Sequence, residues 1–253
     1  MSVVEGPPRV VARVRGPESD LAFAVTDVSC WVSVLRRPGA DGGPGDTVGT
    51  FRTSCSSGEA DAAVDAARRT LAARHDGEGG DVGWSIDLEG RSAIVSHGTA
   101  VDEGLDAAVD PLIARALATP VAAVQLEVHV VDVPGMGAML GFTFASLGTE
   151  STSLFLEAER LAVTSESGDD VAFAPPTLGL IDADGALRDG IRAVAELPPG
   201  RRATCSLPFP GSGDGAHATA SGSIILAGPW AAVGDQPFTV GARVQVVPKG
   251  ALG

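Results

Sequence analysis

The sequence predicts an α+β protein in two parts: a ferredoxin-like (split β-α-β) sheet with two helices over residues 1–133, and an all-β sandwich over residues 138–253. The first part rests on the element order strand, helix, strand, strand, helix, strand between residues 47 and 132. The second rests on the loss of helical periodicity after residue 133, where Gly, Pro, Ser and Thr recur about every 8–12 residues. A chain of 253 residues that is 44% hydrophobic has enough apolar residues for two such cores.

Strands open the chain. Val10, Ala12 and Val14 alternate with their neighbours, which predicts a strand, and a second alternating set covers residues 28–34. We expect these two strands to extend the sheet of the first part. Glycine and proline at residues 37–48 then predict a surface loop, and a third strand fits residues 48–54.

The clearest predicted element is the helix that follows. Ser56 and Glu59 have the spacing of a capping box, in which each side chain accepts a hydrogen bond from the other residue's backbone N–H. Apolar residues, most of them alanine, recur at helical spacing from Ala60 to Leu71, and Gly77 is expected to end the helix. The alanine stripe predicts close packing of this helix on the sheet.

A hairpin, a second helix and a strand complete the first part. Residues 82–97 predict the hairpin, and residues 101–118 predict the helix. Asp110 and Pro111 lie inside that helix as a pair typical of a helix start, so we expect a kink or two short helices. Alternation over residues 124–130 predicts the last strand.

Short strands separated by turn residues predict the sandwich of the second part. They are expected at about residues 139–146, 152–164, 171–174, 177–182, 187–196, 201–209, 220–227 and 238–247. We place the boundary between the two parts in the glycine-rich residues 134–137.

The charge balance argues against polyanionic partners. Eighteen basic and 32 acidic residues give a net charge of 18 − 32 = −14. The field of such a chain repels polyanions, so we expect neither a nucleic-acid partner nor binding to an anionic membrane.

Cysteine usage and the first residues predict the compartment. Cys30, Cys55 and Cys205 lie far apart and form no C-x-x-C pair, so neither a disulfide framework nor a structural zinc site is expected. The first eight residues lack the basic and apolar regions of a standard secretory signal. Together these features predict a cytoplasmic protein.

Cys55 is the single candidate nucleophile. It directly precedes Ser56, where the positive end of the helix dipole lowers the pKa of a thiol. A nucleophilic cysteine also needs a base, and His75 lies at the far end of the same predicted helix. An ordinary packed cysteine at a strand end is the favoured interpretation.

Two other polar patterns have ordinary explanations. His129 and Glu127 share one face of a predicted strand, which allows a metal or acid–base pair. No third ligand is evident, and a solvated polar face is the far more common explanation. Residues 182–185 lack the later ligands of a calcium loop and predict a hairpin turn instead. We therefore expect no metal and no cofactor.

The leading hypothesis is a non-catalytic binding or assembly protein, an accessory or structural subunit. We expect it to form a homo-oligomer, because sheet edges invite pairing with another chain. Its partner is then another protein or a second copy of itself. An enzyme with Cys55 as nucleophile at the junction of the two parts is the alternative, and a small-molecule sensing or carrier module is the third hypothesis.

Overall fold

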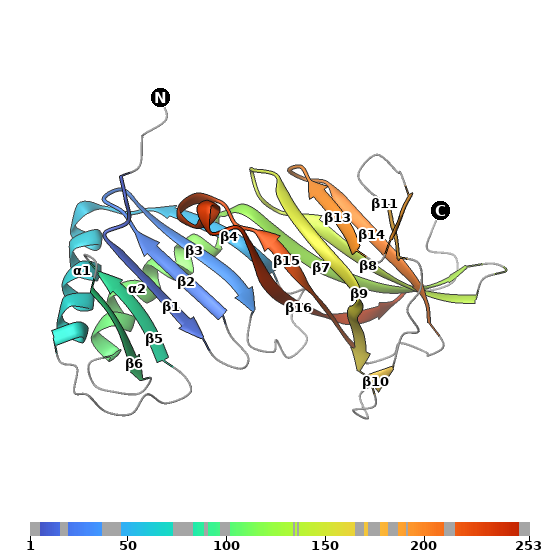
Figure 1. Cartoon of the computed structure of the whole chain (residues 1–253), viewed down its shortest axis with the longest axis horizontal. Coiled ribbons are helices and arrows are strands. Elements are labelled where there is room, and N and C mark those ends of the chain that lie inside the picture. The colour runs from blue at the N-terminus through green and yellow to red at the C-terminus, as the bar shows by residue number, and fades with distance from the viewer. Residues whose placement is uncertain are drawn as a thin grey trace.

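The computed structural model describes residues 6–15, 20–36, 47–72, 83–88, 91–96, 102–133, 135, 137–164, 170–171, 178–181, 187–190, 192–209 and 216–247. Within these residues, sixteen strands belong to one large mixed sheet, accompanied by two α-helices and one 3-10 helix. The protein is therefore mainly β. The two α-helices lie beside the N-terminal strands, at the left of Figure 1, and the later strands extend to the right.

The N-terminal part contains seven strands and both α-helices. Their bounds are β1 (Val10–Arg15), β2 (Asp20–Val25), β3 (Ser29–Arg36), β4 (Thr47–Ser54), α1 (Ser57–Ala72), β5 (Gly83–Leu88), β6 (Arg91–Ser96), α2 (Asp102–Leu117) and β7 (Pro120–Val133). The order across this part of the sheet is β6-β5-β1-β2-β3-β4-β7, and each neighbouring pair is antiparallel. Both helices pack on the same face, because their buried residues form one hydrophobic cluster with those strands.

This strand order differs from the simple ferredoxin-like order. In that order the hairpin of β5 and β6 would lie directly beside β4, whereas here β3, β2 and β1 lie between β4 and β5. The early strands therefore fill the middle of the sheet instead of extending its edge. One of them, β2, is an element that the sequence prediction lacked. Phe23 and Ala24, which are consecutive residues of β2 and point to opposite faces, are both fully buried. The two faces of this strand therefore show little contrast in polarity.

The helices partly follow the sequence prediction. The capping box is confirmed, since the Ser56 backbone N–H donates to Glu59 Oε2 over 2.8 Å and the Glu59 N–H donates to Ser56 Oγ over 3.3 Å. The expected division of the second helix is wrong, because α2 continues through Pro111. Pro111 is exposed, so it lies on the side of α2 away from the core.

The C-terminal part as described consists of strands and η1. The bounds are β8 (Gly137–Ser146), β9 (Thr152–Thr164), β10 (Asp170–Val171), β11 (Leu178–Ile181), β12 (Leu187–Gly190), β13 (Arg192–Leu197), β14 (Arg202–Pro208), β15 (His217–Ile225), η1 (Gly228–Val233) and β16 (Asp235–Val246). One branch of the sheet runs β7-β8-β14-β11-β12, and the other runs β16-β15-β9, with β10 and β13 both paired to β9. The single strand expected at residues 187–196 is instead two strands with different partners, β12 and β13.

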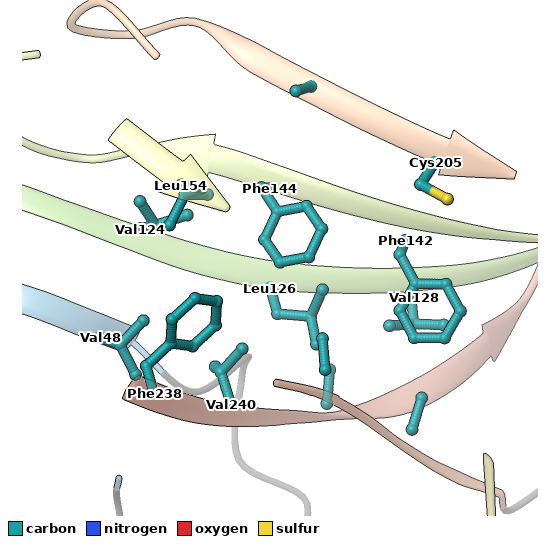
Figure 2. Packing of buried hydrophobic residues seen from close by; sticks show 14 of the residues in the cluster. Val48, Val124, Leu126, Val128, Phe142, Phe144, Leu154, Cys205, Phe238 and Val240 are labelled. Atoms are coloured by element: carbon teal, nitrogen blue, oxygen red, sulfur yellow. The ribbon is translucent and has the colours of Figure 1, made fainter. Parts of the chain in front are cut away.

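Strand β7 connects the two halves of the molecule. Ala123 belongs to the hydrophobic cluster under the helices, whereas Leu126 and Val128 belong to a second cluster between the two C-terminal branches. Figure 2 shows part of this second cluster, to which β8 contributes Phe144 and β16 contributes Phe238. The expected boundary at residues 134–137 falls where β7 ends and β8 begins, and these two strands pair with each other in antiparallel register. Residues 134 and 136 lie outside the described residues. The division into domains at residues 133 and 138 stays a prediction.

A contact around Trp31 also joins the halves. Trp31 alternates with Cys30 and Val32, so its ring lies on the face of the N-terminal sheet opposite the helices. Gly228, the first residue of η1, packs directly against this ring, because a Cβ atom there would lie 2.6 Å from it. The Ala227 N–H also donates to the Thr50 hydroxyl over 3.1 Å.

The described helices were also compared with the requirements of a membrane span. Within the described ranges, none has the length and apolar character needed to cross a bilayer.

Candidate functional site

A depression of about 410 Å³ lies on the outward face of β7, β8 and β14. Phe142 and Phe144 of β8 point into the C-terminal core, so the residues that alternate with them point outward. The depression, here called the β8 depression, is lined by His129, Val131, Met139, Gly141, Thr143, Thr204 and Ser206. It lies on the middle strand of three, because β8 pairs with β7 on one side and with β14 on the other.

Strand register explains the position of the β8 depression. Gly141 of β8 pairs with His129 of β7 on one side and with Ser206 of β14 on the other. Because Gly141 has no side chain, the middle strand leaves a gap in this row, and the flanking side chains form its walls.

Polar groups around the gap are held partly by one another. The hydroxyls of Thr143 and Thr204 lie 3.1 Å apart and share a hydrogen bond. Arg202 binds the Glu127 carboxylate with both terminal nitrogens, over 3.1 Å and 3.4 Å. The outward face therefore combines neutral hydroxyls with a locally neutralised carboxylate.

His129 lies between these groups. Its Nε2 atom is 3.9 Å from a Glu127 oxygen, beyond hydrogen-bond length. Its Nδ1 atom is buried and has no hydrogen-bond partner among the described residues. A buried polar atom without a partner is costly, and the described residues leave this nitrogen unsatisfied.

The structure gives Cys55 a different environment from the one expected. Cys55 is buried at the end of β4, and its Sγ atom contacts the Ser56 carbonyl oxygen at 3.4 Å. Burial, followed by the nearby Glu59 carboxylate, raises the pKa of Cys55, while Arg115 and Arg9 oppose this rise. The lowering of the pKa expected from the helix dipole is therefore wrong in direction, since removal from water outweighs it.

The other two cysteines are also buried. Burial raises the pKa of Cys30 and that of Cys205 to about 12. All three cysteines are free thiols. None of them lines the β8 depression. Cys205 lies on the same strand as Thr204 and Ser206, but it alternates with them and points into the C-terminal core.

The sequence placed no histidine beside Cys55, and the charged side chains that act on this thiol are Glu59, Arg115 and Arg9. Of the other histidines, His129 lies on β7 and His217 begins β15. His75, like residues 182–185, lies outside the described residues. Across the described ranges, no three His, Cys, Asp or Glu side chains gather in a way that would hold a metal ion.

Sequence reasoning identified one wall of the depression and missed the rest. The alternation of β7 placed Glu127 and His129 on one face, and the structure confirms that they are close. The alternation of β8 could also have placed Gly141 and Thr143 outward. No local signal could have added Ser206, because β14 reaches β8 only through long-range pairing.

Comparisons with known proteins identify no family. No family model and no curated protein matches the chain. Two crystal structures of a GH20 exo β-N-acetylglucosaminidase from Vibrio harveyi, one with N-acetylglucosamine and one of an inactive mutant, match with TM-scores of 0.21 and 0.19 at 18% sequence identity. Each match covers 49% of this chain and 18% of the enzyme chain. Similarity this low carries no argument about fold or function.

Proposed function

We propose that the chain is a non-catalytic binding or assembly protein that holds its partner on its sheet surfaces. One observation carries this proposal. The polar side chains that the fold gathers surround an open depression, whereas the thiols lie apart from it in apolar surroundings that favour their protonated form. Such an arrangement supports recognition by shape and hydrogen bonds better than it supports covalent chemistry.

A serine-based hydrolytic site is the strongest catalytic reading of the β8 depression, and the geometry argues against it. Such a site needs a serine bonded to a histidine that is in turn bonded to a carboxylate. Here the His129–Glu127 distance is 3.9 Å, and Glu127 is engaged by Arg202. Strand β8 is also paired along both edges, so its amides are used in the sheet and do not form an oxyanion hole.

The finer architecture belongs to the same proposal. We propose that residues 1–133 form an expanded ferredoxin-like domain, in which three strands are inserted between the first strand and the hairpin. Both helices still cross between strands that point the same way, as in the simple form of that fold. Residues 138–253 would then form the sandwich, with the β7-β8-β14 and β16-β15-β9 branches on either side of one hydrophobic core.

The proposed mode of action is association with another protein or with a second copy of the chain, in the cytoplasm. Within the described pairings, β6 is bonded only to β5 and β12 only to β11, so each offers a backbone edge to a further strand. The net charge of −14 makes nucleic acid an unfavourable partner.

Thiol reactivity separates this proposal from the enzyme alternative. We expect iodoacetamide at pH 7 to modify Cys30, Cys55 and Cys205 much more slowly than an unfolded cysteine peptide, as measured by peptide mass spectrometry. Rapid and selective modification of Cys55 would overturn the non-catalytic assignment, because only an activated thiol reacts in that way.

Native mass spectrometry tests the mode of association. A discrete homo-oligomer is the expected result, and its mass should persist across a range of protein concentrations. A monomer at all concentrations would contradict self-association and leave a different protein as the partner.

The depression also favours a second candidate function, a small-molecule carrier or sensor. Its volume of about 410 Å³ lies within the usual range of small-molecule sites, roughly 300–1,000 Å³. The enzyme with Cys55 as nucleophile has no comparable support, because the raised pKa of Cys55 reduces its thiolate fraction.

A further inference from the structure

The glycine at the floor of the β8 depression is not required by the backbone. Two other strand glycines are required, because a Cβ at Gly49 would lie 2.3 Å from the Ala122 carbonyl oxygen and one at Gly222 would lie 2.2 Å from that of Phe155. At Gly141 the nearest atoms would be 3.8–3.9 Å from the added Cβ, which is ordinary contact. Gly141 also does not have the positive φ that would exclude a side chain.

A glycine inside a strand is therefore unfavourable here without a structural reason. It loses more backbone entropy on folding than alanine and offers no side chain to pack against its neighbours. A valine or threonine at this position would fill the gap between His129 and Ser206. The absence of a side chain keeps the depression open, and a strand glycine of this kind marks a position that a ligand approaches closely.

The lining residues divide into a polar and an apolar side. Ser206, Thr204 and Thr143 supply hydroxyl groups. Val131 and Met139, which pair with each other across β7 and β8, supply an aliphatic surface. A ligand that satisfies both sides is amphipathic.

The charge of the site excludes an ionic ligand. No Lys, Arg, Asp or Glu is among the residues that line the depression, and the nearby Glu127 is already paired with Arg202. An ion placed there would lose its hydration without gaining a partner of opposite charge. The lining therefore favours an uncharged ligand.

We propose that the β8 depression binds an uncharged, amphipathic small molecule. Its hydroxyl or amide end hydrogen-bonds to Ser206, and its short aliphatic end lies on Met139 and Val131. This inference rests on the proposed binding function, since it names the class of ligand for one of the surfaces described there.

Methyl NMR of the full chain tests the ligand class. The protein carries three methionines, and the Met139 methyl serves as the reporter. Hexan-1-ol and hexanamide are titrated as uncharged probes, with hexanoate and hexylammonium as charged probes of the same length. We expect saturable shifts of the Met139 methyl with the uncharged pair, and binding of the charged pair weaker by roughly tenfold or more.

Two variants locate the site. Gly141→Val should fold, should melt at a temperature no lower than wild type, and should lose the probe-dependent shift, because its side chain occupies the gap. Gly58→Ala is the matched control, since an added Cβ at this open position in α1 meets no atom within 4 Å, and it should bind the probes like wild type. If Gly141→Val does not fold, Ser206→Ala replaces it and should weaken binding of both uncharged probes.

The inference would be overturned if neither uncharged probe gave a saturable shift of the Met139 methyl signal. Equal binding of the charged and uncharged probes, or wild-type binding of the probes by Gly141→Val, would also overturn it. A Met139 shift that depends on protein concentration without any probe would also overturn it, because a second copy of the chain would then occupy the surface. Failure of the broader function is distinguishable, since rapid labelling of Cys55 leaves the probe titration unchanged.

Discussion

At the scale of single residues, Glu59 joins three elements around the start of α1. One carboxylate oxygen caps the helix through Ser56, and the other binds Arg115 of α2 over 2.7 Å. The guanidinium of Arg115 also donates to the Ser54 carbonyl oxygen over 3.4 Å. Glu59 therefore joins the start of α1, the last turn of α2 and the end of β4.

The ionisation of Glu59 predicts an acid-dependent loss of stability. The hydrogen bond from Arg115, followed by those from Ser56, lowers the pKa of Glu59 from 4.5 to about 2. Because the folded-state pKa lies below the unfolded value, its contribution is present above pH 4.5 and is lost as the pH falls toward 2. Glu59→Gln should be less stable than wild type at pH 7, and the difference should disappear across this acid range.

Urea unfolding at a series of pH values measures this effect. Glu196→Gln, a change of an exposed glutamate on β13, is the control and should follow the wild-type pH dependence. A gap between wild type and Glu59→Gln that stays constant from pH 7 to pH 2 would contradict the assigned ionisation.

At the scale of secondary-structure elements, local patterns were predictable and strand partners were not. The capping box of α1 depends on residues three apart, so the sequence alone was enough to locate the start of the helix. Strand β2 has apolar residues on both faces, which hides its alternation. The insertion of β1–β3 between β4 and β5 depends on long-range pairing that no local pattern encodes. For the same reason, Glu127 and His129 were placed on one face, but Ser206 was not placed beside them.

The close packing of η1 on the N-terminal sheet predicts that one added methyl group at Gly228 lowers the stability of the protein. Gly228→Ala introduces a Cβ 2.6 Å from the Trp31 ring at a φ of +67°, so η1 must move away from the sheet. Gly234→Ala is the matched control, because Gly234 has a φ of +82° but open space around it. We expect Gly234→Ala to lose about 1–3 kcal/mol from backbone strain, because its φ of +82° and ψ of −161° lie in a region that essentially only glycine adopts. Gly228→Ala should lose about 1–3 kcal/mol from overpacking in addition to its own backbone strain.

Chemical denaturation of the two variants provides the measurement. Equal losses of stability would show that the packing of Gly228 against Trp31 contributes nothing beyond backbone strain.

Helix α2 offers a stabilising substitution. Pro111 lies inside the helix and is exposed, so it removes one backbone hydrogen bond without contributing to the core. Pro111→Ala should raise the free energy of unfolding by about 1–3 kcal/mol, as measured by urea denaturation. A loss of stability would mean that α2 is shaped around the proline and cannot use the restored N–H.

At the scale of the whole molecule, β7 couples the two hydrophobic clusters. Its fourteen residues pair with β4 near one end and with β8 over the remainder, and β16 runs parallel to it. Because β7 contributes side chains to both clusters and pairs with strands of both parts, we expect a loss of packing in one cluster to destabilise the other as well.

Phe142→Ala tests this coupling. Phe142 is fully buried in the C-terminal cluster, so its truncation should cost about 3–5 kcal/mol. We expect hydrogen exchange to speed up at the amides of Phe23 and Val25 in the N-terminal sheet as well as in β8. Unchanged exchange at Phe23 and Val25 would show that the two halves unfold independently.

The three strands between β4 and β5 also fix how chains with a similar sheet can vary. Each neighbouring pair from β4 to β5 is antiparallel, so three intervening strands make β5 point the same way as β4. Within the β5–β6 hairpin, it is then β5 that pairs with β1, and β6 lies on the outer side. Gain or loss of a whole hairpin preserves this parity. Gain or loss of a single strand reverses it, and the hairpin would then have to dock through β6 or turn over.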